Sequence, residues 1–180
     1  MHSITRELLE YLDQQRSVLK SAFESVAIEL RDHPPAPERW SAANVVEHLA
    51  IVEARVATLL SDRIEEHRPE LLALTITDPI LPTINYKRMY DRSNRVKAPE
   101  TAIPTGLDAS SAWAALEKSG LKMRTMLVAN DGLDLSPIKN PHPRFGLLSV
   151  YEWVAFLGAH EVRHAAQIRE DSAAAATAAT

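Results

Sequence analysis

The chain has 180 residues, a length that suits one domain with a buried core of its own. Hydrophobic residues make up 46% and charged residues 24%, which is typical of a soluble globular protein and argues against intrinsic disorder. The net charge of -4 and the lack of any dense block of lysine and arginine exclude a broad basic surface for nucleic acid.

The chain contains no cysteine, which excludes disulfides, thiolate metal ligands and a cysteine nucleophile and fits a reducing compartment. The first ten residues are amphipathic and charged, so they do not predict a secretory signal. No apolar run approaches the roughly 20 residues that a membrane-spanning helix needs. We therefore expect a cytoplasmic protein with neither a nucleic-acid nor a membrane partner.

The first third of the chain has the periodicity of two amphipathic helices. Apolar residues recur at intervals of three and four and predict a helix over roughly 2–31, which the segment HPPAPE at 33–38 ends. Ser41 predicts the N-cap of a second helix, which continues to about Glu66 and stops at Pro69. Its apolar stripe consists of Val45, Leu49, Val52, Val56 and Leu59.

The rest of the chain predicts a long connection and two more helices. The irregular, proline-containing segment 67–107 indicates a crossover of about forty residues. Asp108 predicts the N-cap of a third helix that stops at 130–132, and Ser149 that of a fourth, after a proline-rich link at 136–146 in which we expect no strand pair. The candidate core positions of the third helix are Trp113, Leu116, Leu121, Met123 and Leu127.

These elements predict an all-α fold, a four-helix bundle with a long crossover between helices 2 and 3. Residues 1–171 form the predicted domain and 172–180 a flexible C-terminal tail. His48 and His164 each lie roughly 10 Å from a predicted helix end, so they reach the same depth if the second and fourth helices are antiparallel. The crossover is long enough to allow this, because it lets the third helix run parallel to the second.

Three histidines are predicted to point into this bundle. His160 and His164 lie about 40° apart on the apolar arc of the fourth helix, and His48 lies within the apolar arc of the second. A buried imidazole needs a hydrogen-bond partner or a metal ion. The pattern therefore predicts a metal site, and the alternative is a set of core histidines bonded to each other or to water.

The segment HEVRH at 160–164 also matches the HExxH signature of zinc peptidases. Those enzymes complete their zinc site with a downstream ligand, either a glutamate on a later helix or a histidine reached through a helix-breaking glycine. Here Gln167 and Glu170 occupy the corresponding positions and the helix continues, which places Glu170 more than two turns from His160. The geometry argues against a peptidase.

Three stretches of the sequence together resemble one protein family. They are RWSAANVVEHLAIVE at 39–53, VKAPETAIPTG at 96–106 and HPRFGLLSVYEWVAFLGAHEVRHAAQI at 142–168. In order and spacing they resemble the DinB-like superfamily of bacterial four-helix-bundle proteins, which includes a YfiT-like group of metal-dependent hydrolases and proteins that use low-molecular-weight thiols. The resemblance runs over most of the chain and implies the metal ligands His48, His160 and His164.

Three neutral imidazoles leave open positions on a divalent ion, which is typical of a working site rather than a closed structural one. Zinc or nickel suits imidazole best, and iron or manganese also fits. A bound water or thiol would lose its proton easily there, and a thiol would have to arrive on a cosubstrate. We expect a metal-dependent enzyme with a small-molecule substrate, a low-molecular-weight thiol S-transferase or a hydrolase. The alternative is a non-catalytic metal-binding stress or sensing protein.

Further residues have assigned roles in this prediction. Glu161 is a candidate catalytic base beside the metal, and the alternatives are that it holds a ligand histidine or pairs with an arginine. His142 is expected to fix a turn. The crossover is the best candidate for a segment that covers the site, because it is longer than joining two helices requires. A homodimer is left open.

Overall fold

The structure is a computed structural model that describes residues 1–92 and 97–178, the last four of these by their backbone only. Its helices and strands are α1 (Ser3–Glu24), α2 (Ala42–His67), α3 (Ala109–Ala129), β1 (Lys139–His142), β2 (Gly146–Ser149) and α4 (Val150–Ala178). Short 3-10 turns occur mainly in the crossover, among them Tyr86–Tyr90 and Glu100–Ala102. Within the described ranges, no helix combines the length and the hydropathy that a membrane span requires.

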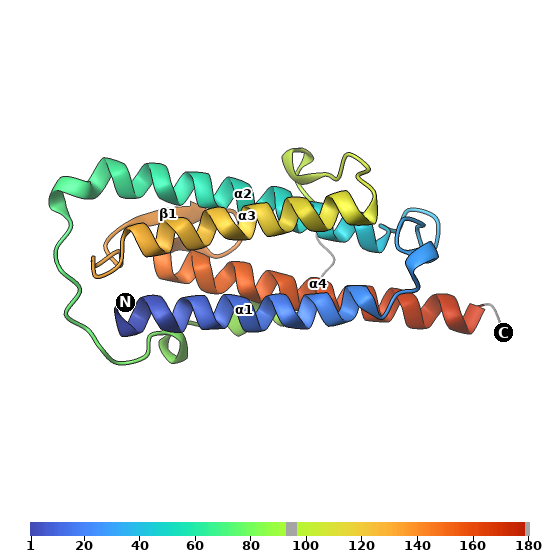
Figure 1. Ribbon diagram of the computed structural model, residues 1–180, viewed down its shortest axis with the longest axis horizontal. Helices are drawn as coiled ribbons and strands as arrows, with labels where there is room; N and C mark the ends of the chain where they lie inside the picture. Colours follow the sequence, from blue (N-terminus) through green and yellow to red (C-terminus); the bar gives the residue numbers. More distant parts are fainter. Residues whose placement is uncertain (93–96, 179–180) are drawn as a thin grey trace.

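The four helices form the predicted bundle. In Figure 1, α1 and α4 run in one direction and α2 and α3 in the other, so α2 and α4 are antiparallel and α3 is parallel to α2. Helix α2 packs mainly on α3, and α1 packs mainly on α4. The all-α fold with a crossover between α2 and α3 is therefore confirmed.

The predicted N-caps hold because each uses a side-chain oxygen to satisfy a free backbone N–H of the first turn. Ser41 accepts from the backbone N–H of Asn44, whose side chain accepts from the backbone of Ser41 in return. Asp108 caps α3, and Ser149 pairs with Glu152 at the start of α4 in the same reciprocal way. The predicted end of the first helix at residue 31 is wrong, because α1 ends at Glu24 and a separate 3-10 turn follows.

An antiparallel β-hairpin begins in the proline-rich link at 136–146 and ends at Ser149, so the expectation of no strand pair is wrong. Strands β1 and β2 pair in a register that places His142 opposite Gly146. Gly146 has a φ of 76°, a conformation that a residue without a Cβ adopts at little cost. The hairpin was missed because Pro141 lies inside β1 and the strands lack an alternating apolar pattern.

Helix α4 is longer than the sequence predicted. It continues to Ala178, past residue 171 where we placed the end of the domain. The flexibility expected of 172–180 stays a prediction, and residues 179–180 lie outside the described part of the chain.

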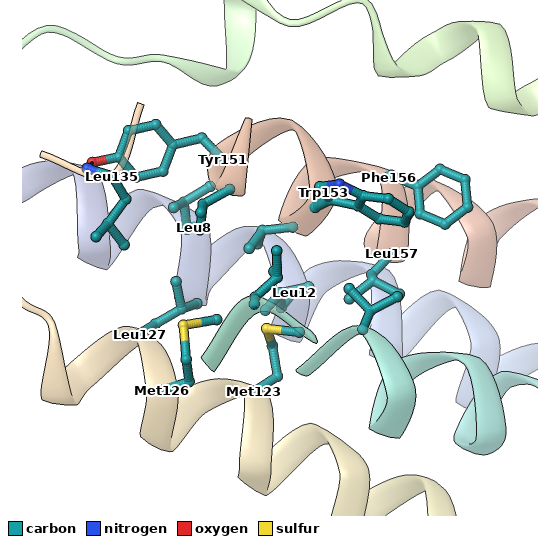
Figure 2. Packing of buried hydrophobic residues seen from close by; sticks show 14 of the residues in the cluster. Leu8, Leu12, Met123, Met126, Leu127, Leu135, Tyr151, Trp153, Phe156 and Leu157 are labelled. Atoms are coloured by element: carbon teal, nitrogen blue, oxygen red, sulfur yellow. Dashed lines mark hydrogen bonds between the residues drawn. The ribbon is translucent and has the colours of Figure 1, made fainter. Parts of the chain in front are cut away.

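The apolar core consists of two clusters that succeed each other along the bundle. Figure 2 shows the larger one, where Leu8 and Leu12 of α1 meet Met123 of α3 and Leu157 of α4. The second cluster lies nearer the other end of the same helices and includes Leu19, Phe23, Leu49, Leu116 and Ile168. Four polar residues lie between the two clusters, one from each helix: Arg16, Glu53, Ser119 and Glu161.

Two predicted core positions are wrong. Leu121 exposes 65% of its surface and Leu59 exposes 38%. Leu121 precedes the buried Met123 by two residues, about 200° around the helix, and therefore faces away from the bundle. On α2 the buried position is Leu60 rather than Leu59.

Candidate metal centre

Three histidines from two helices converge in the bundle. His48 lies on α2, and His160 and His164 lie one turn apart on α4. Their ligand nitrogens all lie within 4.8 Å of one another, and their ring centroids are 4.6 to 5.3 Å apart. His48 and His164 expose 6% and 9% of their surface, and His160 is partly buried. The structure thus brings together all three residues that we expected to bind a metal.

In two of these rings, those of His48 and His164, the Nδ1 atom forms a hydrogen bond to an oxygen. The Nδ1 atom of His48 is 2.7 Å from the carbonyl oxygen of Ala102, and since a carbonyl only accepts, Nδ1 carries the proton. The Nδ1 atom of His164 is 3.0 Å from Oε1 of Gln167. Metal-binding histidines usually donate their outer N–H to an oxygen in this way. The arrangement leaves Nε2 of both rings as a lone-pair donor.

The Nε2 atoms of His160 and His164 are 3.0 Å apart. Either His160 donates an Nε2 proton to His164, or both nitrogens present lone pairs to a shared cation. Two nitrogens bound at about 2.1 Å lie about 3.0 Å apart at a right angle and about 3.4 Å apart at the tetrahedral angle, so the spacing is close to that of two neighbouring ligands. Nδ1 of His160 has no hydrogen-bond partner among the described residues. The third lone pair, from His48, favours the cation.

All three imidazoles are held in the neutral form that binds a metal ion. Burial, with a smaller contribution from His48, lowers the pKa of His164 to about 3. Burial, together with His164, lowers the pKa of His160 well below its usual value. Burial also lowers the pKa of His48, although the hydrogen bond to Ala102 opposes this shift. Protons therefore compete little with a metal ion at neutral pH.

Aromatic rings lie against the histidines on two sides. The ring of Trp40 is 5.0 Å from that of His48, and Phe156 stacks on His160 with a centroid distance of 5.5 Å. The ring centroids of His142 and Phe156 are 4.6 Å apart. The Nδ1 atom of His142 accepts from the backbone N–H of Arg144, which confirms the predicted turn.

Two arginines add positive charge next to the site. Arg163, between the two α4 histidines, donates to the carbonyl oxygen of Met89 at 3.2 Å. Arg92 donates to the carbonyl oxygen of Arg163 at 2.9 Å. Both arginines contribute to the low pKa of His164, behind burial and the effect of His48. Arg92 also forms an ion pair with Glu170, which balances part of its charge.

Glu161 lies in a polar network with Arg16. The Nε atom of Arg16 donates to both carboxylate oxygens, at 2.9 and 3.0 Å, and Nη2 is 2.7 Å from Oε1. The same guanidinium bonds Glu53 at 2.9 Å, and Glu53 accepts from Ser119 at 2.5 Å. Burial raises the pKa of Glu161 to about 7, although Arg16 opposes the shift. These contacts favour pairing with an arginine, and the role of catalytic base stays a prediction.

Gly120 provides space for this network. In the sequence it weakens the pattern of the third helix, because glycine has a low helix propensity. A Cβ at this position would lie 3.1 Å from Nη1 and 3.3 Å from Nη2 of Arg16. The Nη1 atom also donates to the carbonyl oxygen of Leu116 at 3.1 Å. The glycine therefore lets the guanidinium reach the backbone of α3.

Glu47 is a buried carboxylate that sequence reasoning missed, and it exposes only 2% of its surface. It accepts four hydrogen bonds: from the backbone N–H of Thr105 at 2.7 Å, its hydroxyl at 2.6 Å, and the N–H groups of Gly106 and Leu107 at 3.0 and 2.9 Å. Burial alone would raise the pKa of Glu47, but these bonds outweigh it and lower the pKa. A charged residue inside the apolar run VVEHLA was the available signal.

The crossover contacts one of the three histidines and a neighbouring arginine, and its role as a cover of the site stays a prediction. The carbonyl oxygen of Ala102 contacts His48, and the carbonyl oxygen of Met89 accepts from Arg163. Val96, the first residue of the stretch 96–106 that carries part of the family resemblance, lies outside the described residues.

Comparison with known proteins agrees with this architecture. The family model of the DinB superfamily matches residues 11–168. The uncharacterised protein YuaE of Bacillus subtilis (strain 168) is 26% identical over 141 residues, which cover 76% of this chain and 79% of that protein. No solved structure matches. Because the family match spans the bundle and all three histidines, the chain belongs to the DinB superfamily.

Proposed function

We propose that this protein is a metal-dependent enzyme in which His48, His160 and His164 hold one divalent ion beside a small-molecule site. The supporting observation is the convergence of three neutral imidazoles, two of which have their outer nitrogen fixed by an oxygen. Three protein ligands leave positions for water or substrate, as in catalytic rather than structural sites. Zinc or nickel suits these ligands best, and iron or manganese is compatible with them.

The proposed reaction is the transfer of a low-molecular-weight thiol to an electrophile, or hydrolysis. When bound, the ion lowers the pKa of a coordinated water or thiol and so supplies a nucleophile at neutral pH. The chain has no cysteine, so a thiol would belong to a cosubstrate. In this proposal, Arg163 would stabilise negative charge on the nucleophile or substrate, whereas the charge of Arg92 is balanced in part by Glu170. The rings of Trp40 and Phe156 supply apolar surface beside His48 and His160.

We also place the enzyme in the cytoplasm. The support for this proposal is the absence of cysteine, which fits a reducing compartment.

Metal content tests the three-histidine site. We expect elemental analysis of the purified protein to find about one divalent ion per chain, and His48→Ala to lose most of it, because two imidazoles bind far more weakly than three. The matched control is His142→Ala, which removes a nearby histidine outside the ligand set and should keep the metal. Full occupancy in His48→Ala would rule out the site.

Turnover tests the enzymatic part of the proposal separately. The metal-loaded protein should convert electrophiles in the presence of low-molecular-weight thiols, or hydrolyse esters or amides, and a chelator should abolish the reaction. A protein that retains its metal but turns over none of these substrates would support the non-catalytic sensing alternative instead.

A further inference from the structure

The end of the crossover touches two adjacent residues of α2. The carbonyl oxygen of Ala102 accepts from Nδ1 of His48 at 2.7 Å. Three residues later, Thr105 and the two residues after it direct four hydrogen bonds onto the carboxylate of Glu47, at 2.6 to 3.0 Å. The contact of Ala102 orients His48, the proposed metal ligand. The bonds to Glu47 anchor the segment that contains Ala102.

The peptide between these two contacts is stiff. Ile103 is extended, with φ of -74° and ψ of 132°, which is the conformation favoured before a proline. Pro104 has its φ fixed by its ring. With only these two residues between them, an anchor at Thr105 also restricts where the carbonyl group of Ala102 can point.

We infer that Glu47 is a positioning residue for the metal site, which holds residues 102–107 so that Ala102 fixes the ring of His48. Hydrogen bonds to a buried carboxylate are about twice as strong as neutral ones, so four of them make a firm anchor. The ring of His48 then keeps its proton on Nδ1 and its lone pair on Nε2. This inference rests on the proposed metal site.

The coupling is reciprocal, because two linked equilibria must affect each other by the same factor. Metal binding to Nε2 strengthens Nδ1–H as a donor to Ala102 and should therefore stabilise the end of the crossover. In the intact 180-residue chain, we expect cobalt(II) to slow hydrogen exchange of the peptide that covers 99–107. This readout does not depend on turnover.

The test compares cobalt(II) binding by Glu47→Gln with that by the wild type. We expect about a 10-fold loss of affinity, the lower end of the range for partners that orient metal ligands, and a changed visible absorption band of the cobalt ion. The matched control is Glu7→Gln. Glu7 accepts from the backbone N–H groups of Ile80 and Leu81 and anchors an earlier part of the same crossover. The Glu7→Gln variant should lower the free energy of unfolding and leave the cobalt affinity and the cobalt absorption spectrum unchanged.

A milder variant covers the case in which Glu47→Gln does not fold. Thr105→Val removes only the hydroxyl bond of 2.6 Å and should weaken cobalt binding by a smaller factor. If the wild type binds cobalt and Glu47→Gln binds it equally well with the same spectrum, the inference is wrong and the metal site stands. Where Glu47→Gln does not fold, the same result for Thr105→Val overturns the inference. An equal loss in Glu7→Gln would also overturn it. A wild type that binds no divalent metal overturns the site and the inference together.

Discussion

Replacing Arg16 by methionine tests what holds the centre of the bundle together. The guanidinium of Arg16 bonds Glu161 and Glu53, which expose only 3% and 4% of their surface. Methionine keeps most of the length and apolar bulk of the side chain but leaves two buried carboxylates without a cation. Removing one partner of a buried ion pair costs about 3–5 kcal/mol, so we expect a loss of that size in the free energy of unfolding.

The loss should depend on pH in a defined direction. Burial already raises the pKa of Glu161 to about 7 in the presence of Arg16, and without the arginine this pKa should rise further. A group whose pKa is higher in the folded state contributes stability below its unfolded pKa and loses it as the pH rises through the folded value. Above pH 7 the deficit of Arg16→Met should therefore grow, by up to about 1.4 kcal/mol per pH unit.

Urea unfolding of the metal-free protein at pH 6 and at pH 8.5 measures this deficit. The matched control is Arg124→Met, which breaks the exposed pair with Asp13 and should cost less than about 1 kcal/mol at both pH values. A deficit of Arg16→Met that is the same at both pH values would refute the assigned ionisation of Glu161. A variant as stable as the wild type at pH 8.5 would refute the stabilising role of the network.

Two further predictions concern helix packing and proton competition. A Cβ at Gly158 would overlap the ring of Tyr11, with Cζ only 2.8 Å away, so Gly158→Ala should cost about 1–3 kcal/mol despite the higher helix propensity of alanine. Thermal unfolding measures this, and a more stable variant would contradict it. Zinc affinity should fall less than about threefold from pH 8 to pH 6, because the histidine pKa values are depressed, whereas three histidines of ordinary pKa would lose about 60-fold. A competition titration that finds the larger loss would show that protons reach the ligands freely.

Much of the bundle could be predicted because its signals are local. Ser41 and Asp108 act as caps within their own first turn, and the helical period alone turns His48, His160 and His164 inward. These properties depend on the neighbouring residues of one helix. The antiparallel arrangement of α2 and α4 was predicted from the equal depths of His48 and His164, and the length of the crossover allowed it.

The parts that could not be predicted depend on contacts between distant segments. Glu47 is buried because the end of the crossover supplies its four donors, and nothing in the adjacent sequence identifies those donors. Gly120 weakens the helical pattern of α3 in the sequence, and its reason is Arg16 of α1, whose guanidinium lies where a Cβ would come close. The ion pair of Glu161 could not be assigned to a particular arginine for the same reason, since Arg16 lies on another helix.

The location of the histidines at the seam between two pairs of helices has a consequence for unfolding. Helices α2 and α3 form one closely packed pair and α1 and α4 the other, and the ligands come from α2 and α4. If the proposed ion is bound, its sharing by His48 and His160 would form a reversible cross-link that closes a loop of about 110 residues, a constraint worth roughly 4–5 kcal/mol in chain entropy when the link is permanent. Stripping the ion should therefore loosen the seam between the pairs before either pair separates internally.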